Sequence, residues 1–258
     1  MEKNEAGGTY VYAVVPKAAA PEKLEEVTGI EDGKVYSVAS GELAAVVSDV
    51  PTREELRPER RLVAAHQKVL QKVTDASPAV LPVSFGTIAE SADGVRELLD
   101  RYQQDFSQQI QKVEGKVEME VRVTYSAEKP SVFDFLLAGN QELRDARDRL
   151  AGHAATREEK IDLGQKVDAV FTALREEYAR RLEEAIGDRG EARSNPPRSE
   201  KEFVNLSFLV PKDRMADFDA AIQSAGSLFP DNFVVEQVGP FPPYNFVNVH
   251  VTAPSAQP

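Results

Sequence analysis

A ten-residue segment with strict two-residue alternation places the strongest constraint on the fold of this chain. Its apolar positions are Val117, Met119, Val121, Val123 and Tyr125. Side chains of a strand point alternately to opposite faces, so the pattern over residues 116–125 predicts a half-buried strand. Such a strand needs a sheet and a second layer that covers its apolar face. Glu118 and Glu120 fall on the other face, where we expect water to solvate them.

Amphipathic segments supply the covering layer, and the longest of them lies in the second half of the chain. Apolar residues recur along it at steps of three and four, which predicts a helix over about 157–187. A shorter helix is expected near 142–150. Acids and bases nearly balance between 142 and 193, so we expect ion pairs along an exposed helix face. The segment about 188–201 combines glycines, prolines and charges, which predicts a flexible linker.

The first half of the chain alternates strands with helices. Strands are predicted over 9–15 and 79–85, a hairpin over 35–39 and 42–47, and helices over 21–28, 58–74 and 91–113. The last part adds strands over 203–210, 233–238 and 244–251 with a helix over 212–225. This order favours an α+β fold of two ferredoxin-like domains, each with helices on an antiparallel sheet. We expect the domains at residues 1–114 and 115–258, the second carrying the long charged helix.

Charge and composition exclude several classes of protein. The 258 residues carry a net charge of −12 at pH 7, and a surface of that sign repels phosphate backbones, so nucleic acid is not an expected partner. The chain has no cysteine, which excludes disulfides, thiol nucleophiles and iron–sulfur clusters. No window of the sequence is apolar enough for a membrane span, and the first residues do not form a signal peptide. We therefore expect a cytoplasmic protein that binds no lipid membrane.

Candidate catalytic and metal-binding residues are few. The three histidines, His66, His153 and His250, stand in separate segments without a second histidine at helical spacing. His66 lies on the apolar stripe of the helix at 58–74, so we interpret it as a packed side chain with one hydrogen bond. The sequence has no phosphate-binding loop and no nucleophile-elbow motif. We therefore predict no enzymatic activity, no catalytic residue, no metal and no cofactor.

The most unusual segment is the turn Gly-Pro-Phe-Pro-Pro-Tyr-Asn-Phe at residues 239–246. Its three prolines predict a stiff, extended conformation that presents aromatic rings at little entropic cost. Two interpretations stay open. The rings of Phe241, Tyr244 and Phe246 either pack into the core or form a partner-binding surface, and we take these residues as candidate partner-binding positions.

Four segments carry a resemblance to a known family. They read Thr-Tyr-Val-Tyr-Ala-Val-Val at 9–15, Leu-Pro-Val-Ser-Phe-Gly-Thr at 81–87, Ile-Asp-Leu-Gly-Gln-Lys-Val at 161–167 and Gly-Pro-Phe-Pro-Pro-Tyr-Asn-Phe at 239–246. Gly-Lys-Val-Glu at 115–118 adds weaker support. Over almost its whole length the chain resembles the gas-vesicle protein F/L family (GvpF/GvpL). It departs from the family pattern at Ser84, where a basic residue is frequent, and at Phe241, where tryptophan is frequent.

The resemblance implies a fold and a function. It implies two α+β domains, the second a modified ferredoxin-like fold, and it carries no catalytic residue pattern. It further implies a non-enzymatic accessory or minor structural protein of gas vesicles, of the F or the L branch, which binds the major shell protein and other accessory proteins during assembly. The turn at 239–246 and an exposed strand edge are the two candidate docking surfaces. The alternative is a small-molecule-binding regulatory protein with a cleft between its two ferredoxin-like domains.

Overall fold

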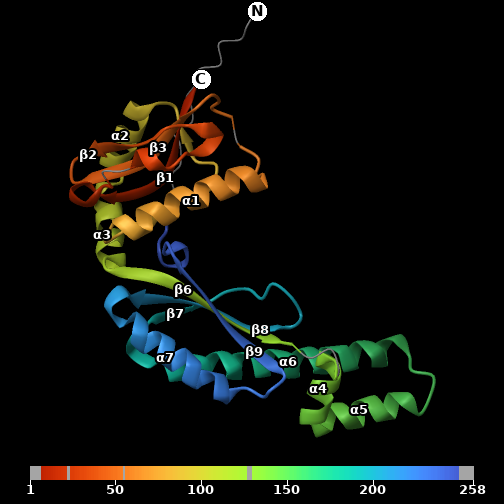
Figure 1. Cartoon of the computed structure of the whole chain (residues 1–258). Helices are drawn as coiled ribbons and strands as arrows, with labels where there is room; N and C mark the ends of the chain where they lie inside the picture. Colours follow the sequence, from red (N-terminus) through yellow and green to blue (C-terminus); the bar gives the residue numbers. More distant parts are fainter. Residues whose placement is uncertain (1–6, 22–23, 55, 127–129, 250–258) are drawn as a thin grey trace, which may run out of the picture. The chain divides into compact units, whose positions relative to one another are not determined.

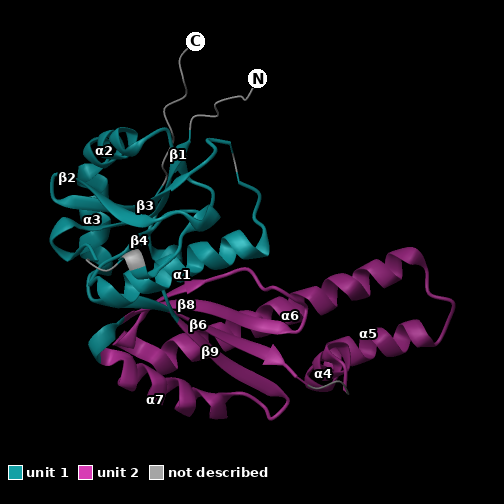
Figure 2. Cartoon of the chain, turned by 45° about the horizontal axis from the view of Figure 1, so that its top comes forward, with its two compact units in different colours: residues 1–118, 211–213, 240–258 teal, residues 119–210, 214–239 magenta. Residues whose placement is uncertain are grey.

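The chain divides into two compact units, and the division does not follow the sequence in a single cut. The computed structural model describes residues 7–21, 24–54, 56–126 and 130–249. Unit 1 combines residues 1–118, 211–213 and 240–258, and unit 2 combines residues 119–210 and 214–239 (Figure 2). The boundary predicted at residue 114 lies close to the first crossing. It assigns residues 240–249 to the second domain, however, whereas the structure packs them in unit 1.

A five-stranded sheet forms the centre of unit 1 (Figure 1). Its strands are β1 (Gly8–Pro16), β2 (Val35–Ser40), β3 (Leu43–Val50), β4 (Leu81–Pro82) and β5 (Ile88–Ala89). The order is β2-β3-β1-β4, β5 also pairs with β1, and these pairings are antiparallel. β1 is buried from Gly8 to Val15, so its unbroken apolar run forms the central strand.

Helices cover the sheet of unit 1. α1 (Arg60–Ala76) packs on one side, and α2 (Ala92–Arg101) and α3 (Gln103–Val113) lie on the other (Figure 1). The helix predicted over 91–113 is interrupted at Tyr102, whose ψ of 16° lies outside the helical range. Between β1 and β2, the described residues form three short 3₁₀ helices in place of the helix predicted over 21–28.

Unit 2 packs two helices on one face of a four-stranded sheet. Its strands are β6 (Lys116–Tyr125), β7 (Glu191–Ser194), β8 (Glu202–Pro211) and β9 (Phe233–Phe241), in the order β7-β8-β6-β9. α6 (Arg157–Ile186) and α7 (Met215–Ala225) cover one face (Figure 1). The alternating strand predicted over 116–125 is confirmed as β6, and its apolar side chains from Met119 to Tyr125 join the core beneath these helices. The α+β class with two antiparallel sheets is confirmed, and the ferredoxin-like description stays a prediction.

α6 packs on the sheet core of unit 2 from Phe171 onward, but only its last third contributes fully buried side chains. The helix has 30 residues, about 45 Å of length, and matches the helix predicted over 157–187. Its buried side chains are Tyr178, Leu182 and Ile186. Before Tyr178 no residue of α6 is fully buried, and Ile161 is 50% exposed.

Two shorter helices accompany the N-terminal part of α6. α4 (Val132–Gly139) and α5 (Gln141–Ala151) contribute Leu136, Leu137 and Leu143 to a small apolar cluster against it. α5 is the short helix that the sequence predicts near 142–150. We call α4, α5 and residues 157–177 of α6 the helical arm.

The structure differs from the predicted flexible linker at 188–201. Residues 191–194 form β7, an edge strand that pairs with β8. The Asn195 amide Nδ2 then donates to Ser207 Oγ at 2.9 Å, and its backbone N–H donates to the Asn205 carbonyl at 2.8 Å. Ladder and side-chain hydrogen bonds therefore hold this segment although its composition is that of a loop.

The structure also differs from the predicted last strand at 244–251. Residues Tyr244–Phe246 form a 3₁₀ turn, and residues 247–249 form no strand. Residues 250–251 of that prediction, with His250, lie outside the described residues. Pro242 and Pro243 lack the backbone N–H that a strand ladder requires, which accounts for the turn.

The uneven burial of α6 predicts unequal stability costs for two leucine substitutions in one helix. Leu182→Ala removes a fully buried side chain and should lower the free energy of unfolding by about 3 kcal/mol. Leu163→Ala, in the half-buried arm, should lower it by about 1 kcal/mol or less. Urea unfolding followed by circular dichroism measures both. Equal losses in the two variants would contradict the half-exposed state of the arm.

Candidate functional site

A buried cluster in unit 1 collects side chains from segments far apart in the sequence. His66 of α1 is 1% exposed, and Tyr10 of β1 is fully buried. Tyr12 stacks on the imidazole with ring centroids 5.7 Å apart, and Phe85 meets its edge at the same separation. Tyr244, from the turn that follows β9, reaches the other side of the ring. Three of the four segments that carry the family resemblance therefore meet around His66.

A chain of hydrogen bonds runs through this cluster. The Gly86 N–H donates to Tyr10 Oη at 3.0 Å, and Tyr10 Oη lies 2.9 Å from His66 Nδ1. His66 Nε2 lies 3.2 Å from Tyr244 Oη. All groups are satisfied when Tyr10 donates to Nδ1 and the Nε2–H donates to Tyr244. Gly86 has a φ of +89°, a conformation that side-chain-bearing residues rarely adopt, so the glycine lets its N–H reach Tyr10.

Burial sets the protonation states of the cluster. It lowers the pKa of His66 to about 4, so the imidazole is neutral at physiological pH. Burial also raises the pKa of Tyr244 to about 12 and raises the pKa of Tyr10, so both hydroxyls stay protonated. A neutral, buried imidazole between two hydroxyls has no access to solvent, which makes the cluster a structural clamp rather than an acid–base site.

A carboxylate fixes the segment that carries Tyr244. Glu118 accepts hydrogen bonds from the Asn245 backbone N–H at 2.9 Å and from Asn245 Nδ2 at 2.6 Å. Lys112 Nζ donates to the Phe246 carbonyl at 3.4 Å. Gln109 bonds Asn248 twice, at 3.1 Å to its carbonyl and at 2.5 Å from its N–H. Residues 244–248 are thus attached to unit 1 at successive positions.

The three predicted partner-binding residues have different surroundings. Phe246 is 3% exposed, and Tyr244 is engaged with His66 in the core of unit 1. Phe241 ends β9 and stays partly exposed.

His66 is buried as predicted, with two hydrogen-bond partners instead of one. His153 is exposed as its loop position suggests, and its Nε2 lies 3.0 Å from Glu159.

The interpretation of Glu118 and Glu120 as solvated side chains is wrong. Their exposures are 4% and 9%, because loop residues cover the polar face of β6. Glu118 holds Asn245, and Glu120 accepts from Arg198 at 2.6 Å. The one sequence signal for Glu118 is its place in the segment 115–118, which carries a weak part of the resemblance.

Unit 2 carries the exposed apolar side chains. Large hydrophobic residues exposed by more than a third occur, among the described residues, only in this unit. They are Phe133 (38%), Ile161 (50%), Leu228 (39%) and Val234 (44%). Neither the strand alternation nor the helical stripes single them out, because exposure depends on which neighbours the fold supplies.

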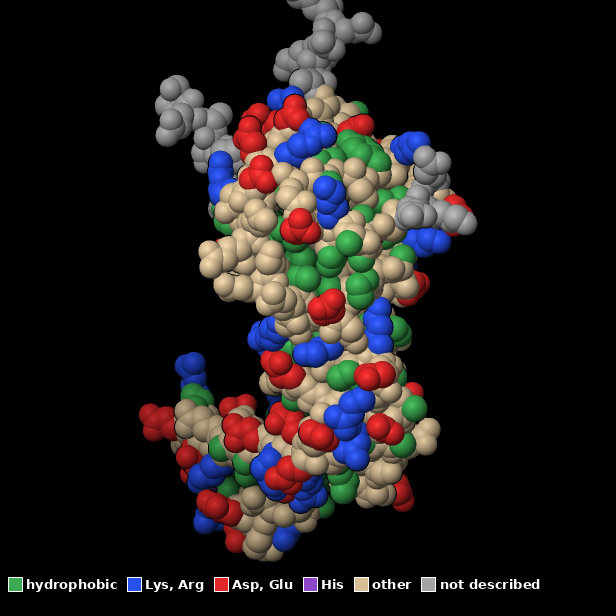
Figure 3. Space-filling view, turned by 90° about the vertical axis from the view of Figure 1, so that its left-hand side faces the viewer, with side chains coloured by type: hydrophobic (Ala, Val, Ile, Leu, Met, Phe, Trp, Pro, Cys, Tyr) green, Lys and Arg blue, Asp and Glu red, His purple; other side chains and the backbone are tan. Residues whose placement is uncertain are grey.

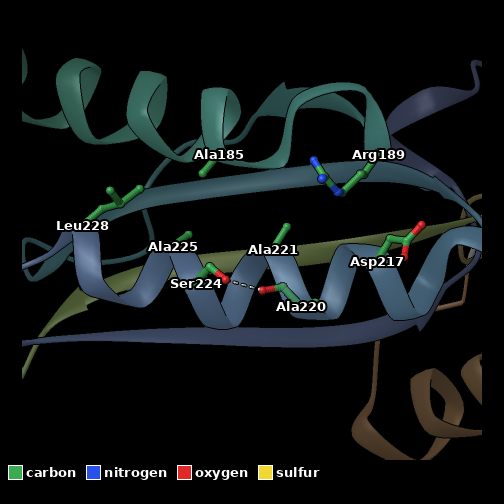
Figure 4. Close-up of a pocket in the computed structure, with 8 residues that line it drawn as sticks. All are labelled: Ala185, Arg189, Asp217, Ala220, Ala221, Ser224, Ala225 and Leu228. Carbon is green, nitrogen blue, oxygen red and sulfur yellow. Dashed lines mark hydrogen bonds between the residues drawn. The ribbon is translucent and has the colours of Figure 1, made fainter.

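Three open cavities lie along the helices of unit 2. The first, about 420 Å³, runs between α6 and α7 and is lined mainly by alanines, with Arg189 and Asp217 near one end and Leu228 at the other (Figure 4). Ser224 Oγ is satisfied there by the Ala220 carbonyl at 2.9 Å. The second, about 630 Å³, lies between α5 and α6, and the third, about 390 Å³, between α4 and α6. The third is lined mainly by apolar residues, whereas ionisable side chains predominate around the second.

Residues 7–21, 24–54, 56–126 and 130–249 contain neither a cluster of metal ligands nor a helix that could span a membrane. These residues contain no group of three or more His, Asp or Glu side chains placed to hold a metal ion. Within the same residues, no helix combines the length and the apolar character that crossing a bilayer requires. Acidic and basic side chains are interspersed on the face shown in Figure 3, so that face presents no field of a single sign.

Fold and cluster define an α+β protein of two units whose buried polar groups serve packing. The model of the family described as gas vesicle synthesis protein GvpL/GvpF matches residues 8–248. This chain therefore belongs to the GvpL/GvpF family and is a gas vesicle-associated protein. Members of the family are structural or accessory proteins of the vesicle.

Individual relatives agree with this assignment. Gas vesicle protein F of Streptomyces sp. (strain CB03234) is 36% identical over 244 residues, covering 93% of this chain and 99% of the relative. Gas vesicle protein L1 of Halobacterium salinarum is 27% identical, covering 95% and 92%. The crystal structure of GvpF from Anabaena sp. PCC7120 has the same fold, with a TM-score of 0.80, 23% identity and coverage of 95% of this chain and 100% of that one.

The low pKa of His66 predicts a stability loss in mild acid. Because the unfolded histidine titrates near 6.5 and the folded one near 4, the unfolded chain binds the proton first as the pH falls. The contribution is complete above pH 6.5 and is lost progressively down to pH 4, by about 3 kcal/mol in total.

Urea midpoints at pH 7, 6, 5 and 4.5 measure this loss against His66→Gln as the control. Carboxylates titrate in the same range, but they do so in both chains, so the difference between the two chains isolates the imidazole. The variant should lose less stability than the parent over this interval. Parallel curves for the two chains would show that His66 is not held neutral by burial.

Proposed function

We propose that this chain is a non-enzymatic accessory protein that binds the major shell protein of gas vesicles during assembly. Membership of the GvpL/GvpF family supports the vesicle role. A shell protein that faces gas must be very apolar, so before assembly it exposes apolar surface and strand edges that favour aggregation. A partner that covers these surfaces keeps the subunit available for ordered growth of the shell.

The observation that carries the proposal is the confinement of exposed apolar side chains to unit 2. Among the described residues, unit 1 gathers Tyr10, Tyr12 and Phe85 around His66 and exposes no large apolar side chain by more than a third. Unit 2 exposes large apolar side chains on α4, α6, β9 and the turn after α7. Contiguous apolar surface left in water marks a contact with another molecule, and we propose that these side chains contribute to such contacts.

Strand β9, whose residues 233–239 belong to unit 2, is the docking element that we favour. It is the last strand on one side of its sheet, and edge strands accept an added strand through backbone hydrogen bonds. Val234, 44% exposed, lies near its start, and Phe241, one of the predicted partner-binding residues, ends it. Tyr244 and Phe246 would contribute indirectly, by attaching the segment after β9 to unit 1.

A charge placed on β9 tests this docking surface. Val234→Lys puts a solvated cation on the exposed side of the edge strand, which disfavours strand addition without removing buried area. The affinity of the full chain for the purified major shell protein should fall about tenfold. Binding is measured with the shell protein immobilised, at low and at moderate salt.

Ser37→Lys is the matched control, because Ser37 is an exposed position on β2, the edge strand of the other sheet. It should leave the affinity unchanged. Absence of binding by the parent chain would overturn the proposed function. Equal loss in both variants, or loss of parent binding in moderate salt, would overturn the β9 contact and its apolar character.

A further inference from the structure

The helical arm leaves one face of α6 uncovered. Residues 157–177 of α6 include Leu163, Val167, Val170 and Leu174, none of which is fully buried. α4 and α5 cover part of this stripe, with Leu136, Leu137 and Leu143 as the buried contacts. A long amphipathic helix gains stability when its apolar side is covered. The part of the stripe that α4 and α5 leave uncovered is therefore available for contact with a further helix.

Two of the cavities described above lie along the same face of α6. The cavity of about 630 Å³ takes Glu159 and Leu163 from this helix, and the cavity of about 390 Å³ takes Val170, Ala173 and Glu177. These positions follow one another at spacings of four, seven, three and four residues. Such spacings place side chains on one side of a helix, so the two cavities form one interrupted groove. We call it the arm groove.

The dimensions of the arm groove match a helix. From Glu158 to Glu177 it extends over about 30 Å, the length of roughly 20 helical residues. The opposite wall comes from α5 at one end and from α4 at the other, through Ala146, Leu150, Phe135 and Leu136. A groove with two helical walls accepts a third helix through anchors at i, i+3, i+4 and i+7.

The charges along the arm groove select the kind of helix. Its α6 wall carries four carboxylates, and the charged side chains of the facing wall are Arg149 and His153. The carboxylates are Glu158, Glu159, Asp162 and Glu177. Three of them have partners within the arm or just beyond it: Glu159 pairs with His153, Asp162 with Lys166, and Glu177 with Arg180 and Arg181. Exposed ion pairs of this kind are weak and exchange partners at little cost. The whole chain adds a net charge of −12, which attracts cations.

The geometry points to the arm groove as a docking site for an amphipathic helix whose polar border is basic. The apolar side of that helix would cover Leu163, Val170 and Ala173, while its lysines or arginines would meet the carboxylates of α6. This inference rests on the proposed function for the identity of the protein that carries the helix. It adds a second contact, separate from β9, for a gas-vesicle protein with such a segment.

A pair of synthetic helices of about 20 residues probes the site. One is built from leucine and lysine with leucines at i, i+3, i+4 and i+7, and the other has glutamate in place of every lysine. Each carries a fluorophore, and its binding to the full chain is followed by anisotropy. The lysine helix should bind and the glutamate helix should not. Equal binding of the two, or no binding of the lysine helix, would overturn the inference.

Two neighbouring tryptophan substitutions separate groove binding from general attraction to a negative protein. Ala173 is exposed and lines the groove, so Ala173→Trp fills it without removing buried area. Thr172, also exposed, lies one position away on a different side of α6. Ala173→Trp should weaken binding of the lysine helix about tenfold, and Thr172→Trp should leave it within about twofold. Equal effects of the two substitutions would mean that the helix binds elsewhere.

Removal of two carboxylates and sedimentation of the full chain give two further tests of the arm groove. The double variant Glu158→Gln/Asp162→Asn, which adds no bulk, should weaken the lysine helix and reduce the salt dependence of its binding. Sedimentation of the full chain shows whether a second copy fills the groove. Self-association that Ala173→Trp abolishes would overturn the basic helix as its occupant. If the shell protein binds and the lysine helix does not, the proposed function stands and this inference fails. If the lysine helix binds and the shell protein does not, the arm groove stands as a docking site and the proposed function fails.

Discussion

The attachment of residues 244–248 to unit 1 is the constraint on which the rest of the structure depends. The chain leaves unit 1 after residue 118, rejoins it briefly at residues 211–213 and returns to it at residue 240, so the last returning segment must be held there. Tyr244 is held by His66, and Asn245 is held by Glu118, the last residue before the chain enters unit 2. One carboxylate therefore ties the exit of the chain to its return, and its loss would remove both hydrogen bonds to Asn245.

The two units differ in which side chains they bury and which they expose. In unit 1, Tyr10, His66 and Tyr244 bond to one another, and all three stay neutral because burial disfavours their charged forms. Unit 2 keeps its sheet covered on one face and leaves the edge of β9 and the helical arm with exposed apolar side chains.

The sequence was most informative where a local pattern decides local structure. The alternation over residues 116–125 became β6, and the apolar stripe from Leu163 to Ile186 became α6, since side-chain period alone separates strand from helix. Predictions failed where a residue's environment comes from distant segments. Glu118 follows the pattern of a solvated residue, yet Asn245, 127 positions away, buries it. Residues 191–194 look like a linker, yet β8 supplies ladder bonds that make them a strand.

By itself, the sequence determined the α+β class, the central strands, the long helix and the family. These depend on periodicity, composition and motifs, which are read directly from the linear sequence. Only the tertiary structure decided that Tyr244 of the turn at 239–246 reaches His66, that Phe246 is buried while Phe241 and Tyr244 stay partly exposed, and that two cavities share one face of α6. Burial, pairing and cavity shape arise between residues far apart in the chain, and no local pattern encodes those distances.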